Sequence, residues 1–196
     1  KSLCSIKKRG CCHYFPEFTL VDIQRMVVLD GGKEALDIIL SNPGTIINHF
    51  NIFSKGKFEE EAYEKYISSG IQLETGNIKD HTIFFRTCPY VKPGSGCTLP
   101  VRFRTAVCNF FICQEILERP DLKEKFEPYL EERSRYSRWL YRENTILQHI
   151  LTENGSDLIS DFKGSLTLLS EIGLSVYEFP LLDPVEFDSP PSFDLS

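Results

Sequence analysis

The chain has 196 residues, a formal net charge of −6 and 41% hydrophobic residues. This length suits a single domain, and 15 Phe, 8 Tyr and 1 Trp supply enough bulk for a core and argue against global disorder. The acidic balance argues against a general nucleic-acid-binding protein, and the sequence has no apolar run of membrane-spanning length. It begins at Lys1 rather than Met, which indicates a processed chain or a part of a longer one.

The first part of the chain is typical of short helices separated by turns. Thr19 is an expected N-cap, followed by helical spacing of apolar residues up to a stop at Gly31-Gly32. The turn signal Asn42-Pro43-Gly44 ends a second helix. In chain order we predict a loop, two helices, a strand and a helix, over residues 1–15, 20–30, 33–40, 46–53 and 58–67.

The second part of the chain is predicted to be mostly helical. Two short strands or a hairpin are expected first, with residues 81–86 as a strand because they are β-branched and aromatic. A Gly/Pro-rich loop and three helices follow, the second of them either continuous or divided near Pro128. Their expected ranges are 71–87 for the strands, 88–104 for the loop, and 105–119, 122–151 and 156–172 for the helices.

The fold class predicted from these elements is mostly α with a small β-hairpin element, organised as a single domain around a cysteine metal site. That domain covers residues 1–176. Residues 177–196 contain four prolines and five acids with no basic residue, which predicts an extended acidic C-terminal tail that lies across the surface or a partner.

Cysteine is the most informative residue type in this sequence. The seven cysteines fall into an N-terminal group and a second group far along the chain: Cys4, Cys11, Cys12, Cys88, Cys97, Cys108 and Cys113. Their odd number and the adjacent pair argue against a disulfide frame, and their clustering favours metal ligands over scattered buried thiols. All seven are candidate metal ligands. The expected location of the protein is the cytoplasm.

Glycine and basic residues surround both cysteine groups. Glycines precede Cys11 and Cys97, where they let a loop turn tightly around a thiolate. Positive charge near the thiols lowers their pKa and offsets the charge of a thiolate–metal site. Arg102 and Arg104 are also candidates to bind a substrate or cofactor carboxylate. His13 adjoins Cys12 and is either a ligand or an exposed turn residue.

The segment CPYVKPGSGCTLPVRFRTAVCNFFIC at residues 88–113, with the upstream C-x6-CC at residues 4–12, resembles the YkgJ-like cysteine-cluster family of zinc- or iron-chelating proteins (CxxCxxCC). This family includes flagellin lysine N-methylase. The most specific part is Cys-Thr-Leu-Pro at 97–100 followed by Arg104 and Cys108. The chain departs from the family pattern in its wider N-terminal spacing, in Thr105 and in Asn109.

Two metals fit an all-cysteine site, and the spacing favours one of them. Structural zinc usually uses two C-x2-4-C knuckles, and this sequence has only one pair with such a spacing, Cys108-x4-Cys113. An iron–sulfur cluster tolerates irregular spacing, because its own sulfides fill the space between the cysteines. We therefore expect a [4Fe–4S] cluster, with zinc as the alternative.

Three functions follow as hypotheses. The resemblance implies a protein-modifying metalloenzyme, similar to a lysine N-methylase, with a protein or peptide substrate and S-adenosylmethionine as a cosubstrate, but no catalytic residue is assigned. The alternative is a non-catalytic zinc-binding structural or interaction module, whose metal removal would unfold it. A redox or metal sensor that uses spare thiols is the third.

Overall fold

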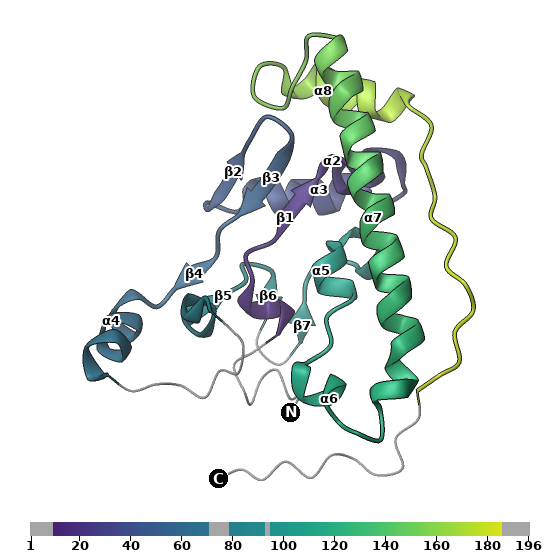
Figure 1. The fold of residues 1–196 in the computed structure, drawn as a ribbon. Helices are drawn as coiled ribbons and strands as arrows, with labels where there is room; N and C mark the ends of the chain where they lie inside the picture. The colour runs from purple at the N-terminus through teal and green to yellow at the C-terminus, as the bar shows by residue number, and fades with distance from the viewer. Residues whose placement is uncertain (1–9, 71–78, 93–94, 186–196) are drawn as a thin grey trace.

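A computed structural model of the chain describes residues 10–70, 79–92 and 95–185. Short 3-10 helices carry the label η, and the labels keep the numbering of Figure 1. In chain order the elements are η1 (Cys11–His13), β1 (Glu17–Thr19), α2 (Leu20–Val28), α3 (Gly32–Ser41), β2 (Thr45–Ile47), β3 (Asn51–Ser54), β4 (Lys57–Phe58), α4 (Glu60–Ser69), η2 (His81–Phe85), β5 (Arg86–Thr87), β6 (Val91–Lys92), β7 (Gly96–Cys97), η3 (Val101–Phe103), α5 (Ala106–Asn109), α6 (Gln114–Leu117), α7 (Lys123–Glu153) and α8 (Phe162–Glu171).

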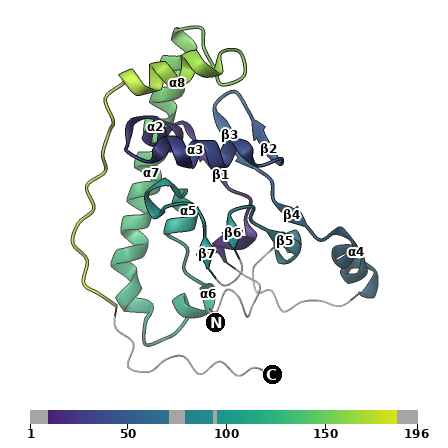
Figure 2. The same ribbon diagram turned by 180° about the vertical axis from the view of Figure 1, so that it is seen from behind.

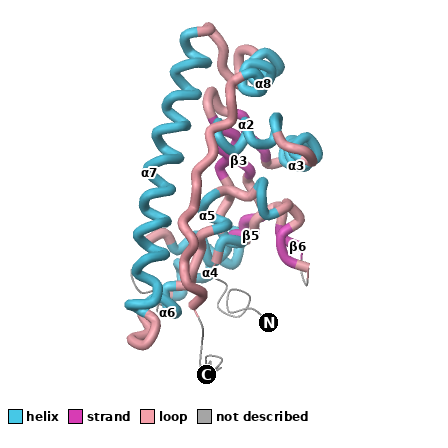
Figure 3. The backbone as a smooth tube through the Cα atoms, turned by 90° about the vertical axis from the view of Figure 1, so that its right-hand side faces the viewer, coloured by secondary structure: helices cyan, strands magenta, loops and turns pink. Residues whose placement is uncertain are grey.

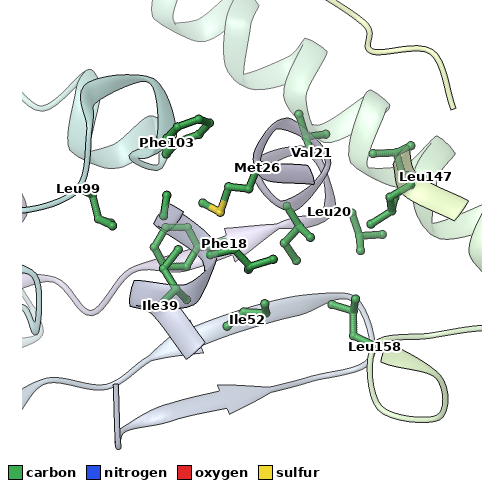
Figure 4. Close-up of a cluster of buried hydrophobic side chains, with 14 of the residues drawn as sticks. Phe18, Leu20, Val21, Met26, Ile39, Ile52, Leu99, Phe103, Leu147 and Leu158 are labelled. Atoms are coloured by element: carbon green, nitrogen blue, oxygen red, sulfur yellow. The ribbon is translucent and has the colours of Figure 1, made fainter. Parts of the chain in front are cut away.

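Helix α2 is the centre of the core, and its beginning is fixed by its own sequence. The Thr19 hydroxyl accepts a hydrogen bond from the Asp22 backbone N–H, and the Asp22 carboxylate accepts one from the Thr19 N–H. This capping box satisfies backbone donors that a helix otherwise leaves unpaired. The predicted N-cap is confirmed. The first turns of α2 then bury Leu20, Ile23 and Met26 completely (Figure 4).

A three-stranded antiparallel sheet lies beside α2. Its strand order is β1-β3-β2, and Phe18 of β1 pairs with Ile52 of β3. Both side chains are fully buried, because alternate residues of a strand point to one face of the sheet. The other sheets are two-stranded ladders, β4 with β5 and β6 with β7. The described part of the chain is thus mainly helical with small antiparallel sheets, as predicted.

The long helix α7 forms one side of the molecule, and α2 packs against both α7 and α8 (Figures 1 and 2). Leu147 and Leu151 of α7 and Leu169 of α8 enter the same core as α2. Pro128 lies inside α7 without dividing it, so the continuous alternative for residues 122–151 is the one observed. Among the described residues, we find no helix with both the length and the apolar character that a bilayer crossing requires.

Several predicted boundaries in the first half are corrected. Helix α2 ends at Val28, before the Gly31-Gly32 pair, and these glycines begin α3 instead. Gly31 has a left-handed φ of 74°, and a side chain on Gly32 would meet the Met26 carbonyl oxygen at 2.1 Å. The strand predicted over 46–53 is a hairpin of β2 and β3, whose turn starts at Asn48.

The strand predicted over residues 81–86 is also corrected. Residues 81–85 form the 3-10 helix η2, because the Asp80 carboxylate accepts from the Thr82 N–H and starts a turn. The rings of η2 then pack against α4, where the ring centroid of Phe85 lies 5.4 Å from that of Tyr66. Only Arg86 and Thr87 are extended, in β5. The remainder of the predicted hairpin, residues 71–78, lies outside the described residues.

The helices predicted from Thr105 and Ser156 are shorter than expected. The first is interrupted after Asn109, so Phe110 to Cys113 connect α5 with α6 and do not anchor a continuous helix. The last helix begins at Phe162, where the Asp161 carboxylate accepts from the Gly164 N–H. Leu158 precedes this helix and is nevertheless buried.

Residues 173–185 follow α8 in an extended conformation without helix or strand. We call this segment the strap. Figure 3 shows it running back along α7. The rest of the predicted tail, residues 186–196, lies outside the described residues.

Candidate metal centre

The two cysteine groups meet through their backbones. The N–H of Cys88 donates a 2.8 Å hydrogen bond to the carbonyl oxygen of Cys12. One residue along the turn, the His13 ring nitrogen Nδ1 lies 2.8 Å from the Arg86 carbonyl oxygen. A carbonyl only accepts, so Nδ1 carries a proton and donates it to this bond. The N-terminal turn η1 is therefore fixed against the strand that leads into Cys88.

Cys97 is brought to the same region by a hairpin. In the β6–β7 ladder Cys97 pairs with Val91, and the Thr98 N–H donates to the Tyr90 carbonyl at 2.8 Å. Both contacts lie within a few residues of Cys88. The Arg104 side chain holds the far side of this loop, with Nε 2.8 Å from the Leu99 carbonyl and Nη2 3.5 Å from the Cys97 carbonyl.

Cys108 lies in the one-turn helix α5, and its sulfur accepts a hydrogen bond from the Thr105 hydroxyl at 3.3 Å. Thr105 occupies the N-cap position of α5, but its hydroxyl makes this contact to sulfur in place of a capping bond. The Asn109 side chain donates to the Val101 carbonyl at 3.0 Å. Thr105 and Asn109 depart from the family pattern, yet each makes a defined contact that positions Cys108.

The thiol of Cys88 has three other cysteine thiols in its electrostatic surroundings. The pKa of Cys88 is raised to about 12, first by burial and further by the neighbouring thiols of Cys108, Cys97 and Cys12. The backbone N–H of Tyr90 donates to the Cys88 sulfur and lowers the pKa. These effects on Cys88, together with the contact between α5 and η1, indicate that the four thiols lie in one region of the fold.

The pKa of the Cys108 thiol is also raised, and the same neighbours contribute. Burial is the largest cause, and the Cys97 and Cys12 thiols add to it. The Thr105 hydroxyl and the Arg104 guanidinium act in the opposite direction, because both favour the thiolate. A metal would reverse this balance, since it binds thiolates and displaces their protons.

The region is anchored in the hydrophobic core. Leu99 precedes η3 and Phe103 is its last residue; both are buried, and Figure 4 shows them reaching toward α2 and α3. Behind Cys88, the buried Tyr90 hydroxyl donates to Ser54 Oγ at 2.6 Å. Gly56 lets this segment pass close to β4, because a side chain there would meet the Thr87 carbonyl oxygen at 2.1 Å. Core packing therefore sets the backbone around the sulfurs.

The two candidate metal groups differ in the sulfur spacing that they require. Among the described residues, no group of three or more His, Cys, Asp or Glu side chains is placed to hold a single metal ion. A zinc ion with Zn–S bonds of about 2.3 Å needs its sulfurs within about 4 Å of each other. A cluster is wider, because bridging sulfides separate its cysteine ligands. Zinc and a cluster therefore require different spacings of the cysteine sulfurs.

The other predicted ligands have different positions. The Cys11 sulfur lies 4.0 Å from the Cys12 sulfur within η1. Cys113 is buried directly before α6, and its carbonyl accepts from the Ile116 N–H. Cys4 lies outside the described residues. Cys12, Cys88, Cys97 and Cys108 carry free thiols, so no disulfide joins these four.

The two predicted substrate-binding arginines differ in their surroundings. Arg104 uses Nε and Nη2 to hold the carbonyls of the Cys97 loop. The exposed Arg102 has its guanidinium 4.9 Å from the Phe103 ring centroid, and its backbone carbonyl accepts from Arg25 at 2.6 Å. The described contacts thus give Arg104 a structural role, and a substrate role for Arg102 and Arg104 stays a prediction.

Three supporting residues were missed at the level of sequence. They are Thr105, which donates to the Cys108 sulfur, Tyr90, whose N–H donates to the Cys88 sulfur, and Arg86, whose carbonyl orients His13. A threonine three residues before a cysteine is a usable signal for the first. The other two use backbone groups, for which the side-chain sequence carries no signal.

Comparisons of this chain with protein-family models, with curated proteins and with solved structures found no match. The resemblance to the YkgJ-like family therefore stays a prediction.

Proposed function

We propose that this chain is a cysteine-ligated metal protein. Of the two candidate metal groups, we favour an iron–sulfur cluster over a zinc ion. The observation that carries the proposal is the approach of four thiols from three separate segments: Cys12 in η1, Cys88 and Cys97 around the β6–β7 hairpin, and Cys108 in α5. Burial and the neighbouring thiols disfavour the thiolate form of Cys88 and Cys108 and keep their sulfurs protonated. A bound metal cation would reverse this preference, because it stabilises the thiolates.

Iron–sulfur chemistry is favoured by the hydrogen bonds to sulfur as well as by the spacing. Cys88 and Cys108 already accept hydrogen bonds from Tyr90 and Thr105. Hydrogen bonds to cluster sulfurs tune the reduction potential of the group. The thiols would hold the cluster, and the cluster would supply electron transfer or an open iron.

A catalytic role is proposed only through the resemblance. Under it the chain modifies a protein or peptide, in the manner of a lysine N-methylase, with S-adenosylmethionine as a cosubstrate. Arg102 is exposed, and its guanidinium does not hold the cysteine loop. Its side chain is therefore available to bind a substrate or cofactor carboxylate.

A non-catalytic zinc module is the second candidate, and one observation favours it. The cysteine segments are already joined by backbone hydrogen bonds, from Cys88 to Cys12 and from Thr98 to Tyr90. A metal at this junction would tie the N-terminal turn to the rest of the fold. Its removal would then destabilise this junction, which the backbone hydrogen bonds alone would hold.

One preparation tests both candidates. The protein is purified without oxygen, its iron, zinc and acid-labile sulfide are measured, and its visible absorption is recorded. A coloured protein with iron and sulfide supports the cluster. A colourless protein loaded with zinc supports the second candidate, and a metal-free protein with reactive thiols refutes both.

A further inference from the structure

The strap crosses α7 next to the segment that carries Cys108. Its position is defined by two of its rings, Tyr177 and Phe179, which we call the latch. The Tyr177 ring centroid lies 5.4 Å from that of Trp139 and 5.2 Å from that of Tyr136. The Tyr177 hydroxyl donates a hydrogen bond to the buried carboxylate of Glu132. The latch is therefore seated on one face of α7.

The latch also contacts the cysteine segment directly. The Phe179 ring centroid lies 5.7 Å from that of Phe110 and 5.1 Å from that of Tyr136. Phe110 immediately follows α5, and its N–H donates to the Ala106 carbonyl at 2.9 Å. Its own carbonyl accepts from the Tyr129 hydroxyl at 3.0 Å. Phe110 thus joins the strap, α7 and the helix that holds Cys108.

The rest of the strap is held weakly. None of the backbone hydrogen bonds found among the described residues involves residues 173–185. Leu181 is fully exposed, and Val176 is 72% exposed. Beyond the latch, residues 181–185 form one wall of a groove of about 660 Å³, whose other lining includes Ile112, Phe126 and Tyr129. A segment with few buried contacts and no backbone pairing opens at low cost.

We propose that the strap is a lid on the Cys108 helix, closed by the latch of Tyr177 and Phe179 and opened by its release. In the closed state Phe110, Tyr136 and Phe179 form a cluster of three mutually contacting rings, which keeps α5 folded and limits access to the Cys108 sulfur. In the open state Phe110 loses the Phe179 ring, so α5 unwinds more often and the sulfur meets solvent. The proposal concerns access to the thiol and does not depend on which metal the thiols bind.

The single tryptophan provides the test, because Trp139 touches the latch. In the full chain as purified, the double variant Tyr177→Ala, Phe179→Ala is compared with Leu181→Ala, which removes an exposed strap side chain. Trp139 emission reports whether the latch has left. Hydrogen exchange at the Cys108, Asn109 and Phe110 amides reports the opening of α5, and iodoacetamide labelling after chelation reports access to Cys108.

The double variant is expected to shift Trp139 emission to longer wavelength and to speed both exchange at the three amides and Cys108 labelling by about tenfold. Leu181→Ala should match the unmodified chain. An emission shift with unchanged exchange and labelling would overturn the proposal. So would an unchanged emission, or an equal effect of Leu181→Ala.

Discussion

The Cys88 backbone N–H donates to the Cys12 carbonyl at 2.8 Å, and this bond joins two cysteine groups that lie far apart in the sequence. Both partners are main-chain atoms, so the bond persists when either side chain is replaced. The backbone of the candidate centre is thus assembled by the protein itself, and a bound metal would act on sulfurs that are already neighbours. This permits variants that remove one sulfur and leave the surrounding chain in place.

Cys88→Ser is expected to lose most of the bound metal while the fold is retained, because serine keeps the N–H that bonds to Cys12 but is a poor ligand for a soft metal. The control is Tyr90→Phe, which removes the hydroxyl bonded to Ser54. It should lower the free energy of unfolding by about 1–2 kcal/mol and keep the metal. Metal analysis and urea unfolding measure the two effects. Full metal content in Cys88→Ser would contradict a ligand role for Cys88.

Gly56→Ala is expected to disturb the Cys88 segment from the outside. The added methyl group would meet the Thr87 carbonyl at 2.1 Å and the Pro89 nitrogen at 2.9 Å, so the backbone beside Cys88 must move. We expect a loss of about 1–3 kcal/mol in the free energy of unfolding and weaker metal retention against a chelator. Gly173→Ala is the matched control, since no atom lies within 4 Å of its added methyl group. Equal behaviour of the two variants would refute the assignment.

Arg104→Ala is expected to loosen the Cys97 loop. It removes two hydrogen bonds to the Leu99 and Cys97 carbonyls, and bonds from a charged donor contribute about 1.5–3 kcal/mol. The comparison is Arg102→Ala, which removes only a contact with the Phe103 ring and should cost less than about 1 kcal/mol. Thermal unfolding of both variants decides the matter. The structural role of Arg104 fails if Arg102→Ala is the more damaging change.

Much of the fold was predictable where one local signal dominated. Thr19 followed by apolar residues at helical spacing predicted α2, because its cap and its buried face agree. The strand prediction for residues 81–86 was wrong because local composition and tertiary packing disagree there. Their β-branched and aromatic composition is typical of a strand, yet the Asp80 side chain and the packing of Phe85 on α4 favour a 3-10 turn. Tertiary contacts of this kind override composition.

The candidate site also has one part that the sequence predicts and one part that depends on the fold. The residue types and their clustering predicted a thiol-rich centre, but which sulfurs meet depends on backbone pairing between distant segments. The bond from Cys88 to Cys12 and the ladder position of Cys97 opposite Val91 are such pairings. Strands of two residues carry too little pattern to be read from the sequence.

Asp157, in the loop before α8, makes the stability of the fold depend on pH, and the direction of this dependence follows from its pKa. Backbone N–H groups of Ser160 and Ile159 donate to Asp157 and, with His49, lower the pKa of its carboxyl from 3.8 to about 2. A lowered folded-state pKa contributes stability above the unfolded value, and this stability is lost as the pH falls from about 4 toward 2. Asp157→Asn should therefore lose less stability than the unmodified chain over this interval. Urea unfolding at several acidic pH values measures it, and identical curves would contradict the prediction.

Differential labelling of the cysteines tests the central claim most directly. The protein is alkylated as purified and again after chelation, and each modified cysteine is located by mass spectrometry. We predict that Cys12, Cys88, Cys97 and Cys108 are protected together by bound metal and become reactive together when it is removed. If these four react at the same rates before and after chelation, or are recovered as disulfides, the chain does not hold a metal through them.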